Sequence, residues 1–159
     1  MSARGESLAK QFEGRAAEMT ELLEKLTEAD WKKVTTAEKW TVGVAAHHAA
    51  GAHEGISGIV KSVAAGRSMP NFTMDMLHDM NAKHASEHAS CTKAETLALH
   101  KTGAAAATAL VRGLSDAELD RSGAVLAGMP AMTTQQVVEG ILINHINEHL
   151  TSIRATVAR

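Results

Sequence analysis

The sequence predicts an all-α fold, a four-helix bundle, on three observations. Apolar residues recur every three or four positions along four long stretches, which is the period of an amphipathic helix. Hydrophobic residues make up 45% of the chain but aromatic residues only 3%, a composition that favours closely spaced helices over sheets. Capping residues and glycines separate the stretches. Long amphipathic helices joined by short connections bury their apolar faces against one another as a bundle.

The first two long helices follow from their apolar stripes. The first runs to about Thr27, which also caps a short helical turn in "TEADW". Its stripe is Leu8, Phe12, Ala16, Met19, Leu23 and Leu26. The second begins after the capping residue Thr41 and ends at about Ala65, where Gly66 favours a helix stop. Its stripe is Ala45, His48, Ala52, Ile56, Ile59 and Val63.

A third helical region is expected from Thr73 to about Arg112. The chain bends at residues 90–92, where Thr92 and Glu95 have the spacing of a capping box. We expect one long, bent helix here.

In the last part of the chain, the sequence predicts a short helix, a loop and the fourth long helix. Ser115 caps the short helix, "DAELD". Residues 122–132 contain glycines and a proline, which predicts a loop. Thr133 with Gln136 then caps a helix that ends near Val157.

Composition also limits the class of protein. The 159 residues suit one domain, 1–159, with one core. A net charge of −2 and the lack of a lysine or arginine run argue against nucleic-acid binding, and the apolar tracts are far shorter than the roughly 20 residues of a membrane span. The N-terminus lacks the apolar middle of a signal peptide, and the single cysteine, Cys91, cannot form an internal disulfide. We therefore expect a cytoplasmic protein.

Three histidines are candidate metal ligands. In "GILINHINEHLTSIR", His145 and His149 lie four residues apart beside an apolar stripe, so both imidazoles can converge on one ion. A catalytic zinc site has three protein ligands and one open position. His48 is the best third candidate, because it lies on the inward stripe of another helix among small alanines. The alternative is that these are core histidines that bind no metal.

The other histidines are not selected as candidate metal ligands. His47 is predicted to face solvent or to lie at an edge. The pair His84 and His88 is predicted to lie on a solvated face, with His84 at the mouth of the pocket as the alternative. The remaining ones are expected to be at the surface or structural: His53, His78 and His100.

The segment "HINEH" differs from the zincin pattern H-E-x-x-H, so Glu148 is not given the role of the zincin base. It is either a charge on the solvent side or a group near the open metal position. Asn81, Asn144 and Glu148 are candidates for hydrogen-bond partners of the ligating rings. The sequence identifies no catalytic acid or base.

Several segments resemble the DinB-like (DinB/YfiT-type) family, and the similarity covers nearly the whole chain. "WTVGVAAHH" pairs Trp40 with His48 eight residues later, and "NHINEHLTSIR" resembles the family's last helix; "DMNAKH" and "LSDAELD" agree in order. The resemblance implies a four-helix bundle of that type, a homodimer, and a divalent metal bound by His48, His145 and His149. It also implies a small-molecule substrate, because related members are transferases or isomerases that use thiols such as mycothiol or bacillithiol. Some of these members replace one histidine of the last helix with glutamate, whereas both are histidine here.

Such a metal site suits two reactions. A divalent ion lowers the pKa of bound water and deprotonates a bound thiol, so the chain is predicted to be a hydrolase or a low-molecular-weight-thiol S-transferase. Imidazole ligands suit zinc, nickel, copper and iron, and we expect zinc or nickel. One alternative is a non-catalytic bundle that binds a metal or a small ligand, and another is a bundle whose histidines are purely structural.

Overall fold

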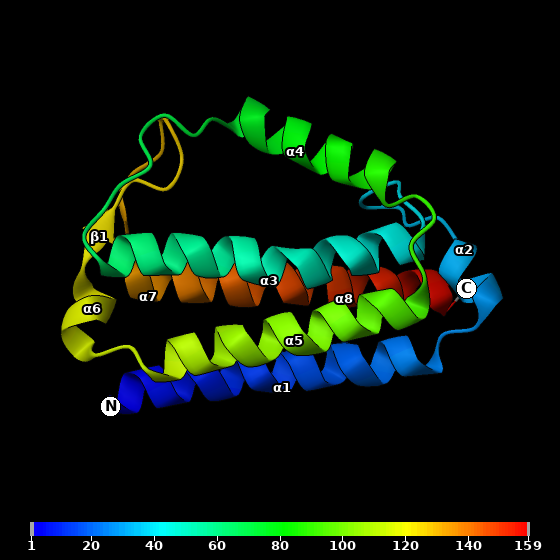
Figure 1. The fold of residues 1–159 in the computed structure, drawn as a ribbon, viewed down its shortest axis with the longest axis horizontal. Coiled ribbons are helices and arrows are strands. Elements are labelled where there is room, and N and C mark those ends of the chain that lie inside the picture. The colour runs from blue at the N-terminus through cyan, green and yellow to red at the C-terminus, as the bar shows by residue number, and fades with distance from the viewer. Residues whose placement is uncertain (1, 159) are drawn as a thin grey trace.

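Four long helices pack side by side around a shared hydrophobic core in the computed structural model, which describes residues 2–158 (Figure 1). Three of them are continuous α-helices: α1 (Ala3–Lys25), α3 (Val42–Ala64) and α5 (Lys93–Arg112). The fourth is built from three consecutive segments: α7 (Thr134–Val137), the π-helical η1 (Val138–Ile143) and α8 (Asn144–Val157). The predicted four-helix bundle is confirmed.

Shorter elements connect the long helices. They are α2 (Glu28–Lys32), α4 (Met74–Glu87), α6 (Asp116–Asp120), β1 (Ser122–Gly123) and β2 (Met132–Thr133). The loop predicted at residues 122–132 is thus closed at its ends by an antiparallel pair, in which Ser122 lies opposite Thr133. Among residues 2–158, no helix is both long and apolar enough to cross a membrane.

The predicted helix starts are confirmed by side-chain caps. In each case a hydroxyl oxygen accepts a hydrogen bond from a backbone N–H in the first helical turn, which otherwise has no partner within the helix. The capping residues are Thr27, Thr41, Thr73, Thr92, Ser115 and Thr133. The predicted stripe of the first helix is also confirmed, because all six of its residues are buried.

The expectation of one bent helix between Thr73 and Arg112 is wrong. The chain forms two separate helices, and α4 lies apart from the four long helices (Figure 1). The Trp31 indole N–H donates to the carbonyl of Cys91 at 3.0 Å, which fixes the break between them. No residue of α4 is buried, and Met74, Met76 and Met80 are exposed. Helical periodicity alone could not distinguish this arrangement from a continuous bundle helix.

Gly43 allows α3 to start against the indole of Trp31. A Cβ atom at Gly43 would overlap Trp31 Nε1, and Trp31 is itself buried. We expect Gly43→Ala to lower the free energy of unfolding by about 1–3 kcal/mol, the usual cost of overpacking a core. Gly58→Ala in the same helix is the matched control, because a Cβ there meets no atom within 4 Å. It should stabilise the helix by about 0.5–1 kcal/mol. Urea unfolding of both variants tests this difference, and equal effects would contradict the packing role of Gly43.

Candidate metal centre

His48, His145 and His149 lie together, one from α3 and two from α8. We call them the first histidine cluster. One ring nitrogen of each lies within 4.8 Å of the others, the arrangement required of residues that could hold a metal ion. Nε2 of His145 is 3.0 Å from Nε2 of His48 and 3.3 Å from Nε2 of His149. The two helices therefore bring together the three side chains selected from the sequence.

The separations between the ring nitrogens fit a shared cation. Zn–N bonds of 2.0–2.1 Å place tetrahedral ligands about 3.3–3.4 Å apart, and a right angle at the metal places them about 2.8–3.0 Å apart. The two observed separations, 3.3 Å and 3.0 Å, lie close to these values. A proton on Nε2 of His145 can form a hydrogen bond to His48 or to His149, but not to both at once. A cation would satisfy the lone pairs of all three rings.

Glu38 orients one of these rings. Its Oε1 is 2.8 Å from Nδ1 of His149, and the Ser152 hydroxyl donates to its Oε2 at 2.6 Å. Because a carboxylate only accepts hydrogen bonds, Nδ1 of His149 carries the proton and Nε2 presents a lone pair to the cluster. A carboxylate behind a histidine is the usual support of a metal-ligating ring. The sequence did not single out Glu38, since it lies in a connector without periodicity.

A tight turn at residues 35–40 places Glu38 and Trp40 at the cluster. The turn is closed by a hydrogen bond of 2.8 Å from the Thr35 N–H to the Trp40 carbonyl. Within it, Lys39 has a φ of 61°, a backbone conformation that non-glycine residues seldom adopt. The Trp40 indole contacts the His48 ring edge-on, with 5.1 Å between ring centroids. The two residues whose spacing resembles the DinB-like family are thus in contact, although the turn that brings them together is not predicted from the sequence.

Burial keeps two rings of the first cluster, those of His48 and His145, uncharged at neutral pH. Burial, together with the neighbouring histidines, lowers the pKa of His48 and of His145 to about 3. Burial alone would raise the pKa of the Glu38 carboxyl, but hydrogen bonds from His149, Ser152 and Thr35 outweigh it and lower that pKa to about 2. At neutral pH the site therefore combines uncharged His48 and His145 rings with one carboxylate.

The π-helical segment η1 ends directly before the metal-binding part of α8. A wider turn adds a residue, and each residue of a helix advances by about 100°, so the positions after η1 are rotated relative to those before it. Of the stripe predicted for this helix, Leu142, Ile146, Leu150 and Ile153 are buried and Ile141 is half-buried. π-helical turns are frequent at functional sites.

The residues proposed from the sequence as ring partners make no hydrogen bond to the three rings, although Asn144 and Glu148 line the depression beside His149. The Asn144 side-chain amide donates to Glu148 at 3.0 Å on the exposed side of α8. Asn81 belongs to α4. Glu148 is exposed, in agreement with its interpretation as a charge on the solvent side.

The predicted position of His47 and the solvated face predicted for His84 and His88 are wrong. The alternative for His84, the mouth of the pocket, agrees with the 5.6 Å between the ring centroids of His84 and His48. His47 is buried, and His84 and His88 are half-buried against it rather than solvated. We call these three the second histidine cluster. Helical periodicity does not predict this cluster, because it predicts residues 73–112 as one bent helix.

His53 and His100 form a buried structural pair, as one of the expected alternatives had it. The Ala16 carbonyl accepts a hydrogen bond from Nε2 of His100 at 2.9 Å, so Nδ1 of His100 is an acceptor. It lies 3.0 Å from Nε2 of His53, which must donate. Burial, with a contribution from His100, lowers the pKa of His53 to about 3. Both rings therefore have fixed tautomers without a metal.

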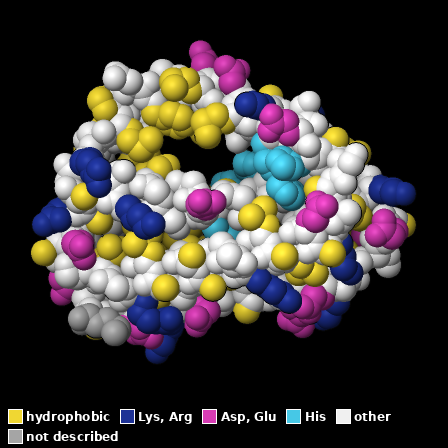
Figure 2. Space-filling view, viewed as in Figure 1, with side chains coloured by type: hydrophobic (Ala, Val, Ile, Leu, Met, Phe, Trp, Pro, Cys, Tyr) yellow, Lys and Arg dark blue, Asp and Glu magenta, His cyan; other side chains and the backbone are white. Residues whose placement is uncertain are grey.

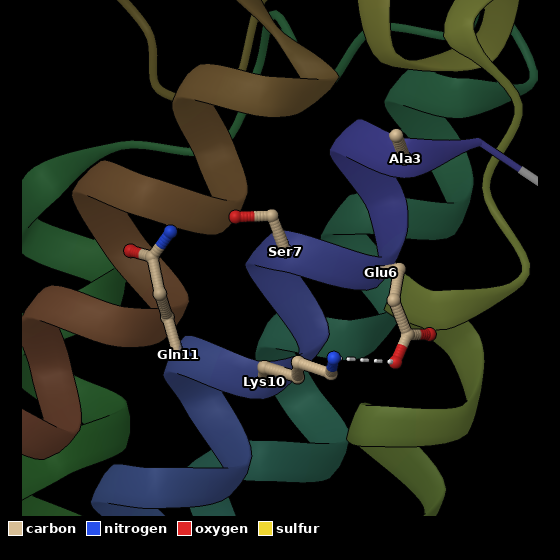
Figure 3. A pocket seen from close by; sticks show the side chains of 5 residues that line it. All are labelled: Ala3, Glu6, Ser7, Lys10 and Gln11. Carbon is tan, nitrogen blue, oxygen red and sulfur yellow. Dashed lines mark ion pairs between the residues drawn. The ribbon is translucent and has the colours of Figure 1, made fainter.

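The surface is hollowed between α4 and the rest of the molecule. Figure 2 shows histidine side chains gathered on one side of this hollow and hydrophobic side chains on the other. A separate shallow depression, lined by Glu38, His149 and Ser152 among others, adjoins the first cluster. A further depression lies on α1, where Glu6 and Lys10 form an ion pair of 3.8 Å (Figure 3). Its lining contains no histidine or cysteine, so it is not a candidate for the same chemistry.

Replacing Glu38 tests its role as a positioning residue. Glu38→Gln keeps a side-chain oxygen near His149 but removes the negative charge, and we expect the zinc affinity of the first cluster to fall by about 10–100-fold. Glu148→Gln is the matched control, because Glu148 is exposed and bonded to Asn144. Competition titration with a zinc chelator measures both variants. Equal affinities would show that Glu38 does not support the site.

Comparisons with known proteins agree with this architecture. The sequence matches the family described as Mycothiol maleylpyruvate isomerase N-terminal domain over residues 12–141. YfiT from Bacillus subtilis, a probable metal-dependent hydrolase with an unusual four-helix bundle topology, has a similar structure, with a TM-score of 0.80 and 18% identity over 100% of this chain and 89% of that one. The mycothiol-dependent maleylpyruvate isomerase has a TM-score of 0.75 and 11% identity; the match covers 96% of this chain and 63% of the isomerase. No curated protein matches the sequence.

Proposed function

Because the chain belongs to the family described as Mycothiol maleylpyruvate isomerase N-terminal domain, we propose that it is a metal-dependent enzyme acting on a small molecule. The observation that carries the proposal is the convergence of three ring nitrogens, from His48, His145 and His149, with Glu38 behind one of them. These three histidines are the proposed ligands, and zinc or nickel the proposed metal.

Hydrolysis is the leading reaction. A divalent ion in the first cluster would lower the pKa of a water or thiol beside it, which provides a nucleophile at neutral pH. Three protein ligands would leave the fourth position of a tetrahedral ion open for this water or thiol, as in catalytic zinc sites. The resemblance in fold to YfiT supports the same choice.

Transfer of a low-molecular-weight thiol is the second candidate, and the family match favours it. In either reaction the chain's own groups have defined tasks. Glu38 holds the Nδ1 proton of His149 and so fixes the ring's orientation, while Trp40 packs against His48. The hydrophobic side chains on the side of the hollow opposite the histidines can contact an apolar part of the substrate (Figure 2).

Activity assays on zinc- and nickel-loaded protein test the proposal. One arm uses p-nitrophenyl esters and anilides, and the other uses mycothiol with an electrophilic fluorophore. We expect turnover in at least one arm, its loss on addition of a chelator, and its loss in His145→Ala. Tight binding of a ligand without turnover would instead support a non-catalytic binding bundle. The homodimer, the single domain and the cytoplasmic location stay predictions.

A further inference from the structure

The second histidine cluster joins α3 to the chain around α4. His47 belongs to α3, His84 to the last turn of α4, and His88 is the residue that caps α4 at its C-terminal end. Nδ1 of His47 is 2.8 Å from Nε2 of His84, and the rings of His47 and His88 stack with 4.1 Å between centroids. One ring nitrogen of each residue lies within 4.8 Å of the others, as in the first cluster.

The hydrogen bonds of this cluster are incomplete. Nδ1 of His84 is buried and has no hydrogen-bond partner among the described residues. A buried polar atom without a partner loses its hydrogen bonds to water and gains none in the fold, which is unfavourable. The buried pair His53 and His100 differs, because the Ala16 carbonyl there fixes the tautomers of both rings. No carbonyl or carboxylate among the described residues fixes the tautomers of His47 and His84 in this way.

The cluster also lies where α4 needs a link to the bundle. No residue of α4 is buried. Near its N-terminal end the chain is held by loop contacts, in which the Ala127 N–H donates to the Phe72 carbonyl at 2.7 Å. At the other end, His84 and His88 contact His47 of α3. An ion shared by these rings would replace weak packing with coordinate bonds.

We propose that His47, His84 and His88 bind a second divalent transition-metal ion, which fastens α4 to α3. Three imidazoles without a carboxylate favour zinc, nickel or copper over magnesium or calcium. The ring of His84 is 5.6 Å from that of His48, measured between centroids, so this ion lies beside the proposed catalytic centre. The second ion would thus hold α4 in place over one side of that centre. The inference concerns residues outside the first cluster and does not require that cluster to be catalytic.

Metal stoichiometry tests the site directly. Purified protein is stripped with a chelator, loaded with zinc or nickel, dialysed and measured by elemental analysis. We expect two equivalents in the native chain, one in His88→Ala, one in His145→Ala and two in His78→Ala. The last variant is the matched control, since His78 is an exposed histidine of α4. Two equivalents of metal in His88→Ala would overturn the proposal. So would a single equivalent in the native chain, if His145→Ala loses it and His88→Ala keeps it. If His145→Ala keeps its metal while His88→Ala loses one equivalent, the proposed function fails and the second site stands.

Hydrogen exchange tests the link between the ion and α4. We expect zinc to slow amide exchange in residues 76–88 of the native chain and of His78→Ala by at least about tenfold, and to leave the exchange of this segment unchanged in His88→Ala. Circular dichroism of the metal-free variants shows whether each is folded before loading. Equal slowing of this segment in native protein and in a folded His88→Ala would contradict the proposal.

Discussion

Replacing His145 with alanine lowers the affinity of the first histidine cluster for zinc or nickel by more than about 100-fold. Mutating a residue that only hydrogen-bonds to a metal ligand typically lowers metal affinity by about 10–100-fold. Removing a ligand itself should lower the affinity by more than that. His145 has the largest expected effect because its Nε2 contacts those of both His48 and His149. Isothermal titration of the metal-free protein measures the change.

The control for this variant is His78→Ala, which removes an exposed histidine outside both clusters. It should bind metal like the native chain. Because His145 is half-buried, the thermal unfolding of metal-free His145→Ala must also be compared with that of the native protein. Native affinity in a folded His145→Ala would contradict the assignment of His145 as a ligand.

Acid destabilises the metal-free fold, and His53 contributes to the loss. Its pKa in the fold is about 3, against an ordinary value of 6.5, so between these values the unfolded chain binds a proton that the folded chain does not. The free energy of unfolding therefore decreases as pH falls from about 6.5 towards 3, by up to about 1.4 kcal/mol per pH unit for this group. Above pH 6.5 both states are neutral at His53, and its contribution no longer changes with pH.

His53→Gln isolates this contribution. Glutamine retains an N–H that can donate to Nδ1 of His100 but does not titrate. Urea unfolding in the presence of a chelator, at several pH values from 7 to 4, should give a shallower pH dependence in the variant than in the native chain. Identical slopes would show that His53 keeps an ordinary pKa in the fold.

The sequence was sufficient for the bundle and for the first cluster because both depend on local patterns. Hydroxyl caps at Thr41 and Thr133 need only a few neighbouring residues, and the apolar stripes follow the helical period. His145 and His149 lie one helical turn apart, and His48 lies on an inward stripe. Their meeting at 3.0–3.3 Å follows from the packing of α3 against α8.

The remaining features depend on contacts between segments far apart in the chain. Glu38 is 111 residues from His149, and no spacing rule connects a residue in a turn with one in the last helix. We expect His47 to face solvent because its neighbour His48 faces the bundle. In the fold, however, α4 and its cap bring His84 and His88 against the side of α3 that carries His47. The π-helical turn in η1 likewise depends on packing, since its residues "VEGILI" also fit an ordinary helix.

Anomalous diffraction at the zinc or nickel absorption edge is the measurement that bears most directly on the shared ion. Crystals of the zinc-loaded protein should show a peak about 2.0–2.1 Å from Nε2 of each of His48, His145 and His149. The contrary result is a metal ion bound at another place while these three rings contact only one another or solvent. Such a result would exclude a metal centre built on α3 and α8.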